Sequence, residues 1–364
     1  MYDNIKITEE SHLKRLPNLT GLRFVLAVLV VIFHIPQFFQ NRGLPFYNDF
    51  AVFHKGSEAV FMFFSLSGFL IIRQLYVEKR ANNTIKIKAF FYRRILRIFP
   101  LYYLVLIFGF LYYRFILPSF GYPTVADYDL FLGVLLSGTF FANIFCTYSP
   151  GGIIEMLWSI AIEEQFYFFI APIFFFLPLK RIKVFLAVFT LLYFALYFSK
   201  VVPLLRNYSM FFFYFSFSGL CGIIMLSSTV QNLVLKFKYP LLFTFLIYFF
   251  TSIFRSNLLD IPYHMLSMVL FGLVISVLSQ KKNILLDNVV LNYLGKISYG
   301  IYMYHAIVMQ FVGFLFLKFL NKIYLSYSIY IVLENTLIIL ITVLLAHFSF
   351  KYYETYFLKL KKKF

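Results

Sequence analysis

Apolar runs recur from residue 19 to the C-terminus, separated by short connections that carry most of the charge. A helix needs roughly 20 apolar residues to cross a hydrocarbon core of about 30 Å, and several of these runs are that long. Because 62% of the 364 residues are hydrophobic and only 13% are charged, the composition excludes an ordinary soluble fold. We therefore predict an all-α, polytopic membrane helix bundle that forms one domain over residues 1–364.

The basic connections predict the topology of this bundle. Loops on the cytoplasmic side are enriched in Lys and Arg, and six connections here are basic, from the N-terminal segment to the tail. All six face the cytoplasm only if one run between Arg97 and Lys180 does not cross, and residues 130–146 are short and broken by small and polar residues. We expect about ten spans in the inner (cytoplasmic) membrane, with both termini cytoplasmic. The eleven apolar runs cover residues 19–39, 57–76, 98–117, 130–146, 156–177, 184–199, 209–226, 240–254, 264–279, 297–317 and 326–350.

The net charge of +18 at pH 7 raises the question of a nucleic-acid partner. The basic residues lie in short clusters between apolar runs, so membrane topology explains them and we expect no nucleic acid. The two cysteines, Cys146 and Cys221, have neither pairing nor metal-ligand spacing, and we expect no metal.

Arg23 and His34 both lie in the first apolar run, eleven residues apart. At 100° per residue this spacing places them on one helix face, about 16 Å apart. A snorkelling arginine and a hydrogen-bonded structural histidine would explain the pair. However, ionisable groups are costly in a span and are functional candidates by default.

Two adjacent acids, Glu163 and Glu164, interrupt the run at 156–177. Each costs about 2.5 to 3.5 kcal/mol at the centre of an inserting helix. Ser159, Glu163 and Tyr167 share a face through their i, i+4 spacing, whereas Glu164 points about 100° away. We expect one carboxylate to face a site and the other to support a neighbouring helix. The alternative is a structural ion pair with an arginine.

Arg94 and Arg97 lie on one face at the start of the third span. Topology alone predicts basic residues at this position, but guanidinium groups also suit phosphate oxygens. Late in the chain, Ser298, Tyr302 and His305 share another face. His305 is either a second functional histidine or a structural one.

These stretches, in this order, resemble the acyltransferase-3 family of integral membrane O-acyltransferases. The resemblance covers nearly the whole chain, and it rests on five motifs rather than on any one of them. The matching motifs are Arg-x10-His (Arg23, His34), FFxLSGFLI (residues 63–71), Arg-x-x-Arg-Ile-x-Pro-x-Tyr (Arg94 to Tyr102), WSxxxEEQFY (Trp158 to Tyr167) and SYxxYxxH (Ser298 to His305).

The resemblance implies transfer of an acyl group, usually acetyl, from cytoplasmic acetyl-CoA to a hydroxyl of a cell-surface polysaccharide or lipid-linked glycan. It also implies His34 as the catalytic residue, with Glu163 and Arg23, and Arg94 and Arg97 as donor-binding residues. We expect Glu163 to orient His34 if the two touch. Some members carry a fused extracytoplasmic domain; this sequence ends at Phe364 without one, so we expect it to act alone or with a separate extracytoplasmic partner protein.

A proton-coupled transporter or flippase is the alternative function, since buried Glu, His and Arg also build proton pathways. The sequence has no clear internal repeat, which is a frequent feature of such transporters. Neither the acceptor nor the length of the acyl chain follows from the sequence.

Overall fold

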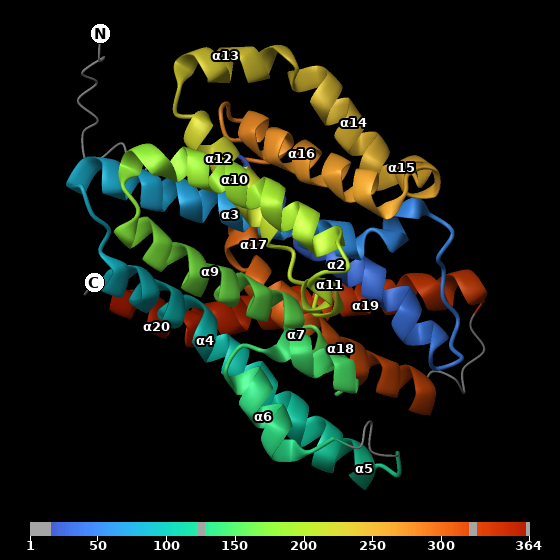
Figure 1. The fold of residues 1–364 in the computed structure, drawn as a ribbon. Helices are drawn as coiled ribbons and strands as arrows, with labels where there is room; N and C mark the ends of the chain where they lie inside the picture. Colours follow the sequence, from blue (N-terminus) through green and yellow to red (C-terminus); the bar gives the residue numbers. More distant parts are fainter. Residues whose placement is uncertain (1–15, 123–127, 320–325, 362–364) are drawn as a thin grey trace.

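The computed structural model describes residues 16–122, 128–319 and 326–361. The basic residues Lys6, Lys14 and Arg15, on which the predicted topology partly rests, lie outside this part of the chain. Within it the regular structure is helical, as predicted, and no strand occurs (Figure 1). The α-helices are α2 (Leu19–Gln40), α3 (Gly56–Asn82), α4 (Ile87–Leu111), α5 (Leu117–Ser119), α6 (Leu130–Gly138), α7 (Ala142–Phe145), α8 (Gly152–Glu155), α9 (Trp158–Phe176), α10 (Leu179–Phe198), α11 (Pro203–Asn207), α12 (Phe212–Ile224), α13 (Ser228–Lys236), α14 (Lys238–Phe250), α15 (Ile253–Asn257), α16 (Asp260–Leu278), α17 (Val289–Lys296), α18 (Ser298–Lys318), α19 (Tyr327–Phe348) and α20 (Thr355–Leu360).

Eight helical stretches of the described residues are long and apolar enough to cross a membrane, and a ninth results if α12 and α13, bent by 114°, count as one. The expected number was about ten. The two expected runs that fall short are 209–226 and 240–254, because α12 and α14 have 13 residues each. The run at 130–146 forms only α6, with nine residues, and α7, with four. Neither is long enough to span, in agreement with the prediction for this run.

Hydrogen bonds between helix termini define one end of the bundle. The Lys79 ammonium donates to the carbonyl oxygens of Phe174 and Phe175 (2.6 and 2.9 Å), so α3 and α9 finish side by side. The Asn18 amide donates to the carbonyl oxygens of Leu278 and Lys281 (2.7 Å each), so α2 starts where α16 finishes. We call this the basic end, because Lys79, Arg80, Lys86, Lys88, Arg93, Lys180, Arg181, Lys183, Lys281 and Lys282 belong to it.

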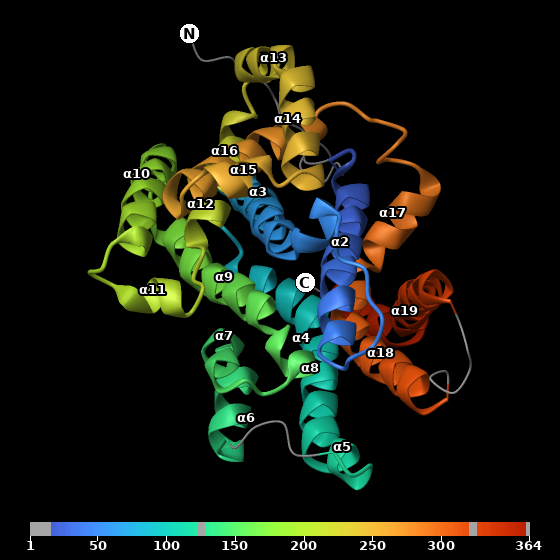
Figure 2. The ribbon, with the colours of Figure 1, turned by 90° about the vertical axis from the view of Figure 1, so that its right-hand side faces the viewer.

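The centre of the bundle is built around α2 and α3, which pack against each other. On one side α3 meets α12, where a Cβ at Gly68 would lie 2.1 Å from the carbonyl oxygen of Phe215. Only glycine allows this approach, so Gly68 of FFSLSGFLI is a close-packing residue between α3 and α12. On the other side α2 packs against α18 (Figure 2). Together with α4 and α9, these helices carry every candidate residue of the sequence motifs.

Candidate active site

A narrow cavity of about 90 Å³ opens between α2, α3, α4, α9 and α18, and we call it the basic cavity. Three arginines from two helices reach it: Arg23 from α2, and Arg94 and Arg97 from α4. Among the described residues of its lining, Glu163 is the one carboxylate, so positive charge is in excess. A cavity of this composition favours an anionic ligand.

Hydrogen bonds hold the Glu163 carboxylate in place. Ser67 donates to it over 2.7 Å from α3, and the Tyr167 hydroxyl donates to the same oxygen from the next turn of α9. The Tyr167 ring in turn lies 5.2 Å from the Arg94 guanidinium carbon. The face shared by Ser159, Glu163 and Tyr167 therefore turns toward the arginines.

Glu164 points away from this face, as the helical period predicts. It is 2% exposed, does not line the basic cavity, and its Oε1 atom has no hydrogen-bond partner. We expected Glu164 to support a neighbouring helix, but its Oε1 atom makes no hydrogen bond to one. Ser298 does line the cavity, and its hydroxyl donates to the Gly295 carbonyl oxygen over 3.0 Å at the start of α18.

A second and larger cavity, of about 630 Å³, lies toward the opposite end of α2, and we call it the histidine cavity. His34 and His305 both line it. Their ring centroids are 5.5 Å apart with 27° between the planes, so the imidazoles stack across the contact between α2 and α18. The structure thus brings together the two histidines that the sequence placed in distant spans.

The two histidines differ in their surroundings. His305 is fully buried, with Nδ1 2.5 Å from the Tyr302 carbonyl oxygen and with Nε2 unpartnered. Because a carbonyl only accepts, Nδ1 carries the proton and Nε2 carries the lone pair. His34 is half-buried and also lines the cavity. Of the two, His34 is the one that a substrate in the cavity can reach.

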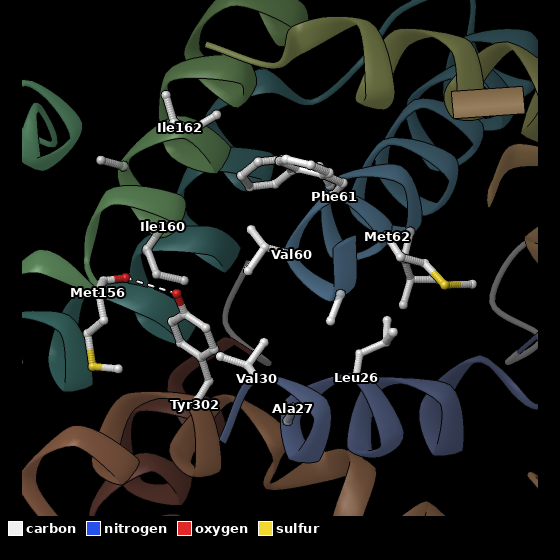
Figure 3. Packing of buried hydrophobic residues seen from close by; sticks show 14 of the residues in the cluster. Leu26, Ala27, Val30, Val60, Phe61, Met62, Met156, Ile160, Ile162 and Tyr302 are labelled. Carbon is white, nitrogen blue, oxygen red and sulfur yellow. Dashed lines mark hydrogen bonds between the residues drawn. The ribbon is translucent and has the colours of Figure 1, made fainter. Parts of the chain in front are cut away.

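Tyr302 separates the two cavities. Its ring lines the basic cavity, and its hydroxyl lies 2.9 Å from the Met156 carbonyl oxygen, to which it donates, and 2.7 Å from the Ser159 hydroxyl. Met156 lines the histidine cavity. Figure 3 shows the Tyr302 to Met156 hydrogen bond, with the apolar side chains of Val30, Val60 and Ile160 around it. We call this layer the partition.

The partition changes how the predicted residues relate to one another. Arg23 and His34 share a face of α2, as predicted, but they open into different cavities. No hydrogen bond joins Glu163 to His34, and the two line different cavities. The expected relay required Glu163 and His34 to touch, and this contact does not occur in the present arrangement.

The sequence interpretation missed a polar cluster at the mouth of the histidine cavity. Gln310 accepts a hydrogen bond from Arg42 (2.8 Å) and one from Tyr112 (3.3 Å), and its own amide lies 3.4 Å from the Tyr113 hydroxyl. The sequence feature that could have indicated this cluster is Gln310 itself, a polar residue within the apolar run at 297–317. No group of three or more His, Cys, Asp or Glu side chains that could hold a metal occurs in the described ranges.

Comparison with known proteins assigns the chain to a family. Residues 16–350 match the acyltransferase-3 family, which is described as an acyltransferase domain. The chain belongs to the acyltransferase-3 family. The family suggested by the five motifs is thereby confirmed, and with it membership in a group of membrane O-acyltransferases.

Three relatives of this acyltransferase-3 protein illustrate the range of the family. Peptidoglycan O-acetyltransferase OatA of Listeria monocytogenes serovar 1/2a is 29% identical over 182 residues, which are 49% of this chain and 27% of OatA. A protein of Staphylococcus aureus (strain COL), provisionally named an O-acetyltransferase, is 23% identical over 97% of this chain and 59% of its own length. A protein of Acidianus two-tailed virus, provisionally named an acetyltransferase, is 29% identical over 82% of this chain and 84% of its own.

The chain thus spans about a quarter of the Listeria relative and about three fifths of the Staphylococcus one. No solved structure matches the chain.

Proposed function

We propose that this protein is an inner-membrane O-acetyltransferase, which moves the acetyl group of acetyl-CoA to a hydroxyl of a cell-surface polysaccharide or lipid-linked glycan. One observation carries the proposal: an arginine-lined cavity and a histidine-lined cavity meet at the Tyr302 partition. The arginine-lined cavity suits an anionic donor, and the histidine-lined cavity suits an acceptor that carries a hydroxyl group. Peptidoglycan belongs to this class of acceptor, and the Listeria relative is named for it.

The donor would approach from the basic end, which faces the cytoplasm by the positive-inside rule. The narrow basic cavity suits the slender pantetheine arm, whereas the nucleotide would remain at the mouth. There Arg94 and Arg97 offer planar guanidinium groups, which bind phosphate oxygens in a bidentate way. The negative charge of Glu163 offsets part of the repulsion among the arginines when no donor is bound.

In the transfer step, the acceptor hydroxyl approaches His34 in the histidine cavity. Neutral His34 accepts the hydroxyl proton as the oxygen attacks the thioester carbonyl, which forms the new C–O bond. The C–S bond then breaks, and the imidazolium returns the proton to the departing thiolate, giving free coenzyme A. Imidazole suits both transfers because its ordinary pKa lies near neutral pH.

For this step the thioester must reach His34 past the partition. Tyr302 and Ser159 lie where the acetyl group would cross, and their hydroxyls can donate to the developing oxyanion once the Met156 bond is released. We therefore assign Tyr302 and Ser159 to positioning of the acetyl group, and His34 to catalysis.

The test is acetylation in inverted membrane vesicles that are supplied with radiolabelled acetyl-CoA and host glycans. Wild-type protein should transfer label to an extractable glycan, and His34→Ala should reduce transfer by about 10² to 10⁴-fold, the usual contribution of a general base. Equal protein levels and membrane insertion make the comparison valid. Full transfer by His34→Ala would refute the role of His34. Proton-coupled solute flux without acetyl-CoA hydrolysis would instead favour a transporter.

A further inference from the structure

A third cavity, of about 320 Å³, lies at the basic end, away from the two cavities of the proposed reaction. It is bounded by α13, α14, the end of α16 and the connection that follows α16. Three lysines line it: Lys238, Lys281 and Lys282. Its remaining wall is largely apolar and includes Leu242, Leu278 and Ile284. Cationic groups above an apolar wall match a ligand that is anionic at one end and apolar at the other.

The charge of the cavity is not balanced by its own lining. No Asp or Glu is among the described residues that line it. The lysines lie at helix ends and in a connection, where basic pockets between membrane helices are known to hold lipid phosphates. The unbalanced charge therefore favours a phosphate group over a neutral ligand.

The surface around the cavity indicates where it sits relative to the bilayer. The connection to α17 and the first turn of α17 carry four large apolar side chains, Ile284, Leu285, Val289 and Val290, that are 65% to 86% exposed. Such a cluster is unfavourable in water but is stable at the boundary between head groups and acyl chains. The cavity thus opens at the level of the lipid head groups.

The wall of the cavity is tied to the helix that carries Arg23 and His34. Asn18, the residue before α2, donates from its side-chain amide to the carbonyl oxygens of Leu278 and Lys281 (2.7 Å each). Its side-chain oxygen accepts from the Asn283 backbone N–H over 2.8 Å. Asn18 itself is buried with φ at 62°, a left-handed conformation that asparagine tolerates well. A ligand that orders this connection would also fix the start of α2.

We propose that this cavity binds the phosphate of an anionic bilayer phospholipid, such as phosphatidylglycerol, through Lys238, Lys281 and Lys282. One acyl chain lies along Leu242 and Leu278. The bound lipid stabilises the connection held by Asn18, and through it the position of α2. The activity of the protein accordingly depends on anionic lipid.

Lipid binding to the full chain in detergent micelles tests the proposal, with phosphatidylglycerol and phosphatidylcholine added separately and bound lipid counted by native mass spectrometry. Wild-type protein should retain phosphatidylglycerol in preference to phosphatidylcholine. Lys281→Gln/Lys282→Gln should weaken phosphatidylglycerol binding by about fivefold for each lysine, since one basic residue near an anionic surface contributes about 1 kcal/mol.

The matched control is Lys180→Gln/Lys183→Gln, which removes two exposed lysines from the same end but away from this cavity. It should bind phosphatidylglycerol as wild type does, and both double variants should unfold at the wild-type temperature in lipid-free detergent. An equal loss in the control, or no loss in Lys281→Gln/Lys282→Gln, would overturn the proposal.

Two soluble competitors separate the lipid from other sources of phosphate. Glycerol 3-phosphate should displace phosphatidylglycerol weakly, because it lacks the acyl chains. Effective displacement by glycerol 3-phosphate would show a site for free phosphate esters, and displacement by coenzyme A would assign the cavity to the acyl donor. Either result would refute the lipid site; the first would leave the proposed acetyl transfer intact, whereas the second would move the donor away from Arg94 and Arg97.

Discussion

The imidazole rings of His34 and His305 stack with 5.5 Å between their centroids, although 271 positions separate them in the sequence. Both rings line the histidine cavity, but His34 is half-buried, whereas His305 is fully buried and bonded to the Tyr302 carbonyl oxygen. The arrangement suggests that His305 fixes the ring plane of His34 rather than contacting the acceptor itself.

Substitutions at His305 separate packing from chemistry. His305→Ala should lower the free energy of unfolding by about 3 kcal/mol, as is typical when a large buried ring is truncated. His305→Phe keeps a ring for the stack but loses the Nδ1 hydrogen bond to Tyr302, so it should cost only about 1 kcal/mol of stability. If His305 only positions His34, His305→Phe also retains most of the acetyl transfer. A loss as large as that of His34→Ala would instead place His305 in the proton transfer itself.

Glu163→Gln should destabilise the protein, because it leaves Arg23, Arg94 and Arg97 around a cavity without a counter-charge. Loss of a hydrogen bond to a charged group costs about 1.5 to 3 kcal/mol. Tyr167→Phe removes only the hydrogen bond to Glu163 and should cost about 1 to 3 kcal/mol. Denaturant unfolding in detergent measures both values. Similar stabilities for Glu163→Gln and wild type would contradict the counter-charge role.

Arg97→Gln should raise the KM for acetyl-CoA by about tenfold or more, because one charge-assisted contact to the donor phosphates is lost. S-acetylpantetheine, which has the thioester but not the nucleotide, provides the control donor. Wild type and Arg97→Gln should use this control donor equally well. A matching rise in KM for both donors would show that Arg97 acts on the thioester or on the fold, and not on the phosphates.

Tyr302→Phe should weaken the partition, since the hydrogen bond to Met156 and the contact with Ser159 are both lost. We expect water to reach the thioester more often, so that more coenzyme A is released for each acetyl group transferred. Thiol release and glycan label, measured in the same vesicles, give this ratio. An unchanged ratio would mean that the surrounding apolar side chains alone form the partition.

Lys361, just after α20, predicts a pH dependence of donor binding. Burial, together with Arg97, Arg94 and Arg93 nearby, lowers the pKa of Lys361 to about 7. The lysine is charged below this pKa and neutral above it, so the KM for acetyl-CoA should rise as the pH increases through about 7. Lys361→Gln should remove this part of the pH profile. Persistence of the same profile in Lys361→Gln would assign it to another group.

Much of the helical layout could be predicted from the sequence, because apolar run length and loop charge act locally. The shared face of Arg23 and His34 follows from the helical period alone. Their separation into two cavities does not, since Tyr302 and Ser159 enter from α18 and α9 and no single-helix pattern encodes that contact.

The polar cluster around Gln310 could not be predicted either, because it also depends on contacts between different helices. Arg42 and Gln310 are 268 residues apart, and their hydrogen bond depends on how α2 and α18 pack. The lengths of α12 and α14 also differ from the runs that predicted them. Apolar composition continues past the point where the chain bends, so hydropathy cannot mark the end of either helix.

The partition at Tyr302 has a consequence for the membrane potential of the cell. A continuous water-filled path through a membrane protein would let protons and ions leak and would dissipate the membrane potential. The side chains of the partition are uncharged, with apolar groups around two hydroxyls. An acetyl group is small and neutral and can cross such a seal, whereas ions and the highly charged coenzyme cannot. In the proposed reaction, the protein therefore exports a chemical group without opening a channel.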